Sequence, residues 1–174
     1  MLRGWAVAGR EPGAQTIAQI QQGIEATSMP ASRCYGLGLL AEAHRRLGQP
    51  GAGLVAVADA LKRMEESGTW SLEPDLHRLQ GELLLEVKGD GPYPDLTPED
   101  CFRRALEVAR RQHARSPELR AALSLARLWQ SRGDGAAAAS FFAPIYNAFT
   151  EGFDTADLQE AKQLLGELAQ SMVQ

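Results

Sequence analysis

Aromatic residues, cysteines and long apolar runs are all scarce in this sequence of 174 residues. Aromatics make up only 6%, while alanine and leucine abound, which favours helices built from good helix formers. Cys34 and Cys101 are the two cysteines, and without CxxC spacing they indicate neither a disulfide framework nor a zinc site. No window approaches the roughly 18 apolar residues of a membrane span, and the stretch from Met1 to Trp5 lacks the apolar core of a signal peptide. We therefore expect a cytoplasmic protein without a membrane partner.

Positive charge is not in excess either. The net charge is -4 with a pI near 5.4, which argues against a nucleic-acid partner, because such partners require a basic surface. The 44% hydrophobic and 23% charged contents are those of a folded globular chain. The length suits a single domain with a substantial core.

Apolar residues recur three and four positions apart along almost the whole chain, and no alternating strand pattern competes with them. Thr97-Pro98-Glu99-Asp100 is a strong helix start, with a capping hydroxyl, a proline in the first turn and two acids at the positive helix end. Ser116-Pro117-Glu118 repeats that signal, and Thr155 is expected to cap a final helix. The fold class predicted is all-α.

The helices come in pairs. Aligned on one position late in each second helix, the pairs place Gly23, Ala60, Ala105 and Ile145 in register, 37, 45 and 40 residues apart. Small residues at Ala41, Gly81 and Ala126 let the two helices of a pair approach closely, and each pair leaves an apolar face that its neighbour must cover. The pattern is that of tetratricopeptide repeats, which are about 34 residues long. It predicts a right-handed α-solenoid forming one domain, 1–174, with hairpins at about 1–28, 31–67, 71–115 and 116–150 and a capping helix at 155–172.

The two ends differ from the middle. The first hairpin is incomplete, since its first helix has only about ten residues and ends near Gly9. It leaves Trp5, Val7 and Ile17 as an apolar face through which a homodimer could form. The last helix has a polar outer face, as a terminal cap requires, at Gln159, Lys162, Gln163 and Glu167.

Three segments resemble the C-terminal region of large bacterial signalling proteins. They are Leu76–Leu85, Cys101–Arg110 and Phe149–Thr155. In that family a cyclase or a DNA-binding regulatory domain is followed by a nucleotide-binding ATPase and then by a tetratricopeptide array. The resemblance implies a regulatory, partner-sensing region. The residues 89–96 form a longer linker than the repeat needs.

The first helices of tetratricopeptide hairpins line a concave groove, which gives a list of candidate binding residues: Trp5, Tyr35, Glu42, Arg45, Arg46, Asp75, Arg78, Glu82, Glu86, Arg120, Arg127 and Gln130. Arginine forks bind carboxylates, so Arg45, Arg78 and Arg127 could hold an acidic peptide tail. The alternative is that they pair with Glu42, Glu82 and Glu86 on a solvated face.

No pattern marks a catalytic, cofactor or metal site. His44, His77 and His113 are scattered, and the acids between Asp90 and Asp100 do not follow a calcium loop. His44, Trp70 and Trp129 are expected in the core, and His113 at a helix end. The sequence therefore favours a protein that is not an enzyme, acts as a scaffold for a protein or peptide and uses no cofactor. Two alternatives are a small-molecule sensor with its ligand in the groove and a self-association module.

Overall fold

The computed structural model describes residues 13–87, 93 and 95–171. In this part of the chain it contains helices and no strand, which confirms the all-α prediction. The first helix of the first hairpin, with Trp5 and Val7, lies outside the described residues, as does most of the linker 89–96. Among the described helices, none is both long and apolar enough to cross a membrane.

Helix bounds agree with the sequence to within a few residues. The helices are α2 (Ala14–Ala26), α3 (Pro30–Arg46), α4 (Pro50–Ser67), α5 (Glu73–Glu86), α6 (Pro98–Arg111), α7 (Arg115–Ser131), α8 (Gly135–Asn147) and α9 (Ala156–Ser171).

The two helix-start signals have different outcomes. The start of α6 is confirmed, because the Asp100 amide donates to Thr97 Oγ1 at 3.1 Å and the Thr97 amide donates to the Asp100 carboxylate at 3.3 Å. The start predicted at Ser116 is wrong, because the cap position of α7 is Ala114, and Ser116 and Pro117 already lie inside the helix.

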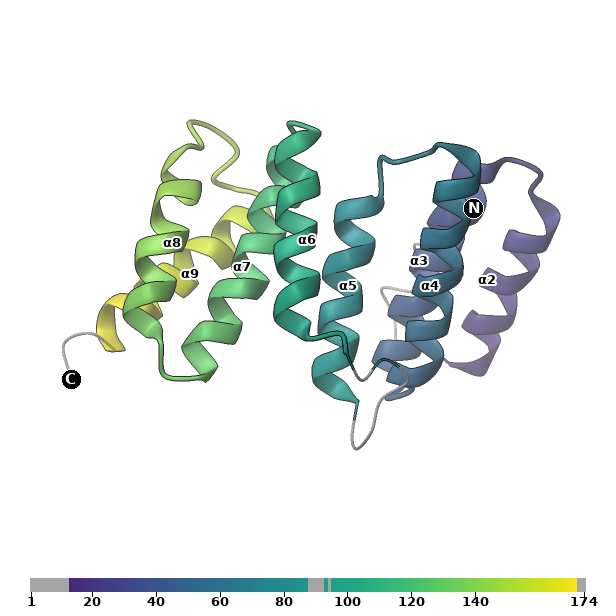
Figure 1. The fold of residues 1–174 in the computed structure, drawn as a ribbon, viewed down its shortest axis with the longest axis horizontal. Helices are drawn as coiled ribbons and strands as arrows, with labels where there is room; N and C mark the ends of the chain where they lie inside the picture. Colours follow the sequence, from purple (N-terminus) through teal and green to yellow (C-terminus); the bar gives the residue numbers. More distant parts are fainter. Residues whose placement is uncertain (1–12, 88–92, 94, 172–174) are drawn as a thin grey trace. The chain divides into compact units, whose positions relative to one another are not determined.

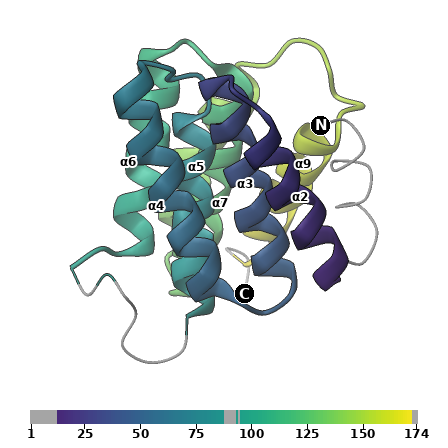
Figure 2. The ribbon, with the colours of Figure 1, turned by 90° about the vertical axis from the view of Figure 1, so that its right-hand side faces the viewer.

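Contacts along the chain define two units, residues 1–101 and 102–174, and each is described by itself. In the first unit α3 contacts α2, α4 and α5, and α4 contacts α5 (Figures 1 and 2). Their shared core includes fully buried Cys34, Leu54, Val57 and Leu83. The single domain and the solenoid remain predictions.

The second unit has the same internal arrangement. α7, α8 and α9 contact one another, and Ala105 and Leu106 bring α6 into the same core. Its largest fully buried side chains include Phe102, Phe142 and Leu164. Four of its surface residues, Gln159, Lys162, Gln163 and Glu167, are exposed on α9, as predicted for the outer face of the last helix.

The two units repeat each other at a spacing of 85 residues, which holds for most of the helix ends and for many buried positions. Arg115 and Ser131, the ends of α7, lie 85 residues after Pro30 and Arg46, the ends of α3. α8 begins and α9 ends at the same spacing from α4 and α5. The buried positions match as well: Cys34 and Leu119, Leu40 and Leu125, Ala41 and Ala126, Gly53 and Ala138, Val57 and Phe142, Leu79 and Leu164, Leu83 and Leu168. The repeating structural unit is therefore four helices long.

This spacing changes the register of the first hairpin. Eighty-five residues before Ala105 stands Ile20, which is 6% exposed, whereas Gly23 is half-buried and an added Cβ there would meet nothing within 4 Å. The alignment on Gly23 is thus three residues out, because a small residue was expected where the core accepts a large one. With Ile20 in register the spacings become 40, 45 and 40 residues.

The close approach predicted for small residues is confirmed in the first unit. A Cβ on Gly53 of α4 would lie 3.1 Å from the carbonyl oxygen of Ala41 on α3, and 2.7 Å from Cδ2 of Leu83 on α5. The Ala41 oxygen belongs to the helix backbone and cannot move aside locally. Gly53 therefore sets the distance between α3 and α4.

We expect Gly53→Ala to lower the free energy of unfolding by about 1–3 kcal/mol, because the added methyl overpacks this contact. Gly23→Ala is the matched control, since it also places alanine inside a helix of the first unit but meets open space. It should raise the stability by about 0.5–1 kcal/mol through helix propensity alone. Urea unfolding followed by circular dichroism measures both, and a stabilised Gly53→Ala variant would contradict the close approach.

Three of the turns between helices have the same hydrogen bonds. In each, the residue after a left-handed position donates its amide to a carbonyl five residues back at 2.9 Å: Gln49 to His44, Ala114 to Ala109, and Asp134 to Trp129. The left-handed positions are Gly48, His113 and Gly133. Glycine adopts this conformation without a steric cost, whereas His113 holds a φ of 54° with a full side chain. His113 thus lies at a helix end, as predicted.

Replacing His113 by glycine should therefore stabilise the protein. The left-handed conformation costs a non-glycine residue about 1–2 kcal/mol, and part of the gain is offset by the extra freedom of glycine in the unfolded chain. We expect a net gain of up to about 1 kcal/mol for His113→Gly and a loss of about 1 kcal/mol for Gly133→Ala in the equivalent turn. If His113→Gly destabilises the chain in urea unfolding, the strain assigned to His113 is absent.

The expected core positions have mixed outcomes. Trp129 is half-buried and its ring centroid lies 5.1 Å from that of Phe141. Trp70 is 46% exposed, so its placement in the core is wrong; it lies in the turn before α5, outside the helix faces that pack. His44 is half-buried rather than fully packed, because its Nδ1 lies 2.9 Å from the side-chain oxygen of Gln49 in the turn.

Candidate functional site

The candidate groove residues lie on three helices, apart from Trp5, which is outside the described residues. Tyr35, Glu42, Arg45 and Arg46 lie on α3; Asp75, Arg78, Glu82 and Glu86 lie on α5; and Arg120, Arg127 and Gln130 lie on α7. The 85-residue repeat makes the α7 residues equivalent to three of those on α3, namely Tyr35, Glu42 and Arg45. The two units therefore present the same face of the first helix of their central hairpin.

Arg45 links α3 to α5 in the first unit. Its Nε donates to Glu42 one turn away at 2.9 Å, and its Nη1 donates to Glu86 of α5 at 2.8 Å. Arg46 donates to the other oxygen of Glu42, also at 2.8 Å. Glu42 is thus held by two guanidinium groups, and only about a quarter of its side chain is exposed.

These contacts shift the acidity of both partners. Burial alone would raise the pKa of Glu42, but the hydrogen bonds from Arg45 and Arg46 outweigh it and hold the pKa below its ordinary value. The hydrogen bond to Glu42 is the largest cause that raises the pKa of Arg45 above its ordinary value. Both groups are therefore charged at neutral pH, and they form a fixed charged cluster between α3 and α5.

Arg78 is the least satisfied of the candidate arginines. Its Nη1 donates to Glu82, one turn along α5, and its Nε lies 3.9 Å from Asp75. Within the described residues Arg78 Nε is buried and has no hydrogen-bond partner. A buried donor left in this way lowers the stability of the folded chain, because the hydrogen bond it makes with water in the unfolded chain is not replaced.

In the second unit the arginines of α7 pair with acids of α9. Arg120 Nη1 donates to Asp157 at 2.9 Å, and Arg127 Nη1 donates to Glu160 at 2.5 Å. Sequence reasoning named Glu42, Glu82 and Glu86 as possible partners and missed both α9 acids. The rule of three and four residues detects pairs within one helix only, and no sequence signal marks these pairs between helices.

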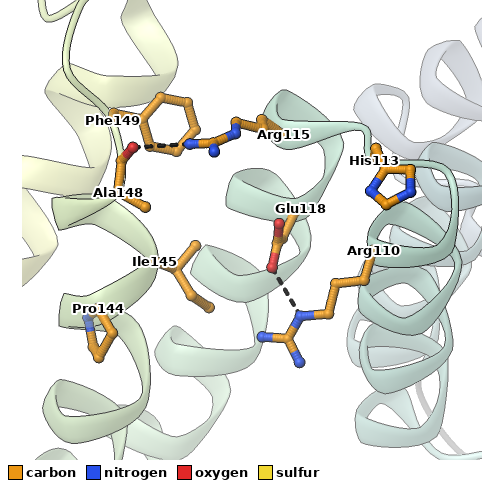
Figure 3. A pocket seen from close by; sticks show the side chains of 8 residues that line it. All are labelled: Arg110, His113, Arg115, Glu118, Pro144, Ile145, Ala148 and Phe149. Carbon is orange, nitrogen blue, oxygen red and sulfur yellow. Dashed lines mark hydrogen bonds and ion pairs between the residues drawn. The ribbon is translucent and has the colours of Figure 1, made fainter.

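A separate pocket opens in the second unit, where α6 ends and α7 begins (Figure 3). Its volume is about 370 Å³. Arg110 and Glu118 pair across it at 2.8 Å, and Arg115 donates to the carbonyl oxygen of Ala148 at 2.8 Å. Phe149, which follows α8, contributes to the pocket wall. None of these residues was a sequence-predicted site residue.

The cysteines are poorly suited to nucleophilic chemistry. Both side chains are buried, and burial is the largest cause that raises the pKa of Cys34 above its ordinary value and that of Cys101 to about 12. The part of the chain that the structure describes contains no cluster of His, Cys, Asp and Glu that could hold a metal ion. The charged groups of the candidate site are instead the arginines and acids that form ion pairs between α3 and α5 and between α7 and α9.

Neither a scan against protein-family models nor a search of the curated proteins finds a match to this sequence.

Stability should depend on pH through Glu42. Its pKa is lower in the folded protein than the ordinary 4.5, so its contribution is present above that value and is lost as the pH falls through the folded pKa. We expect Glu42→Gln to lower the free energy of unfolding by about 1 kcal/mol at about pH 7 and by much less at about pH 3.

Glu107→Gln serves as the control for that measurement. Glu107 forms its ion pair with Arg104 on an open surface, with 62% of its side chain exposed, so its loss should cost at most about 0.5 kcal/mol at either pH. Urea unfolding of the wild-type chain and both variants at the two pH values gives the comparison. An equal effect of Glu42→Gln at both values would show that its charge is not what stabilises the cluster.

Proposed function

We propose that this chain is a tetratricopeptide-like scaffold that docks a peptide, or another protein domain, on the faces formed by α3 with α5 and by α7 with α9. The main support for this proposal is that α7 repeats α3 at a spacing of 85 residues. The candidate residues of these two helices therefore lie on the same helix face. In both units this face has arginine ion pairs that skip one helix: Arg45 of α3 pairs with an acid of α5, and Arg120 and Arg127 of α7 pair with acids of α9.

The packing within each unit supports a tetratricopeptide-like repeat. Ala41 and Gly53 lie twelve residues apart on the two helices of a hairpin, as do Ala126 and Ala138, and all four are buried. A left-handed glycine, Gly48 or Gly133, follows seven residues after the first of each pair. Small residues at these places, with a tight turn between them, are what a repeating helical hairpin requires, and stacking of such hairpins would give a right-handed solenoid.

The charges of the face favour a partner with a mixed surface that includes acidic groups. In the first unit, Arg45, Arg46 and Arg78 lie among Glu42, Asp75, Glu82 and Glu86. A carboxylate from the partner would have to compete with these acids, so binding would be selective rather than driven by net charge.

The place of the scaffold in a larger protein is proposed from the three resembling segments. From their likeness to bacterial signalling ATPases, we propose that this region senses a partner in the cytoplasm and passes the signal to an ATPase and to a cyclase or DNA-binding domain.

Charge reversal tests the proposed faces. We expect Arg78→Glu and Arg127→Glu each to reduce the capture of the partner by about tenfold, since each replaces a donor by a repelling charge. The immobilised chain would be incubated with a bacterial lysate and the retained polypeptides quantified by mass spectrometry. Arg104→Glu is the control, because Arg104 pairs with Glu107 on α6, a helix that carries none of the candidate face residues. If retention is the same for all three variants and the wild type, docking occurs elsewhere.

A further inference from the structure

The pocket of the second unit is lined by two chemically different sets of residues. Pro144, Ile145 and Phe149 form an apolar wall at the end of α8 and just beyond it. Arg110 and Arg115 come from the end of α6 and the start of α7, and the Arg115 side chain reaches across to the Ala148 carbonyl beside Phe149 (Figure 3). At about 370 Å³ the pocket lies at the small end of the range for ligand sites, about 300–1,000 Å³.

Two of the pocket residues, Pro144 and Ala148, differ in chemical type from the residues at the equivalent positions of the first unit. Eighty-five residues before Pro144 and Ala148 the first unit has Asp59 and Arg63, which form an ion pair at 2.9 Å along α4. In the second unit the charged pair is replaced by a proline and a methyl group. The second copy has therefore exchanged a charged surface for an uncharged one at the position that lines the pocket.

The lining residues carry an excess of positive charge. Arg110 uses its Nε to bind Glu118, and Arg115 uses one Nη to bind the Ala148 carbonyl, which carries no full charge. A guanidinium has five N–H donors, so both arginines retain donors for a second acceptor. Glu151 and Asp157 line an adjacent cavity that shares Arg115, but Asp157 is paired with Arg120. Arg115 is thus the cation best placed to receive an anionic group.

We propose that this pocket binds a ligand with one carboxylate next to a branched apolar group. The carboxylate lies on Arg115 and Arg110, and the apolar group packs against Ile145, Pro144 and Phe149. A free organic acid and the C-terminal residue of a polypeptide share this chemistry. The site differs from the faces proposed above, since it uses the end of α6 and the start of α7 instead of the exposed sides of α7 and α9.

Calorimetric titration of the full chain provides the test, with N-acetyl-leucine as the probe and the uncharged N-acetyl-leucinamide as its matched control. We expect saturable binding of the acid and at least about tenfold weaker binding of the amide, because a charge-assisted hydrogen bond is lost. Saturable binding of N-acetyl-Ala-Ala-Leu that is tighter than that of N-acetyl-leucine would identify a polypeptide end as the source, and equal affinity would identify a free acid. Equal binding of acid and amide, or no saturable binding of any probe, overturns the proposal.

Two variants locate the site. Ala148→Arg restores the residue of the first unit and should abolish binding by filling the pocket, while Arg115→Gln should weaken it by about tenfold. Arg115→Lys retains the charge and should bind more tightly than Arg115→Gln even if both lower the melting temperature.

Two further variants are controls. Arg63→Gln, at the position of the first unit that is equivalent to Ala148, should bind as the wild type does. Arg127→Glu should also leave the affinity unchanged, so that failure of this site and failure of the docking faces can be told apart; loss of binding in Arg63→Gln would contradict the placement.

Discussion

The close approach of two helices at small residues is the contact on which each unit depends. Gly53 lies against the backbone of Ala41 on α3 and against Leu83 on α5. This one position therefore limits both the distance between α3 and α4 and the distance between α4 and α5. A larger residue there would press against Leu83 of α5 and against the backbone of α3. The ion pair between Arg45 and Glu86 joins α3 to α5, so it depends on how these helices pack. The geometry of the charged face is therefore a consequence of the core.

The sequence was sufficient to predict the helices and their boundaries because both depend on local chemistry. Periodic apolar residues, prolines in first turns and the Thr97–Asp100 capping box act within a few residues of one another. It was not sufficient for the start of α7. There a turn centred on His113 in a left-handed conformation ends α6 and lets the next helix begin at Arg115, before the Ser116-Pro117 signal. A histidine does not predict a left-handed residue at the end of a helix, whereas a glycine does.

The candidate site could be predicted only in part for a related reason. The arginines of the face were named correctly as surface residues on the first helices, but the partners of Arg120 and Arg127 are on α9, 33 residues or more away. Such pairs depend on which helix lies beside which. The true period was also hidden, because hairpin spacings alternate between 40 and 45 residues and only their combination, 85, recurs without gaps. Alignment on small residues found the hairpins but misplaced the first by three positions.

Comparison of the two units separates what the fold requires from what it leaves open. Position 41 is alanine in both copies, Ala41 and Ala126, and both side chains are fully buried in the core. One position further along, the first unit has Glu42 and the second has Arg127, yet each forms an ion pair. The packing thus tolerates either sign of charge at this position provided that a neighbour supplies the opposite one. Since the fold does not determine the sign, the pattern of charge along these faces can differ between the two units without a change in the packing.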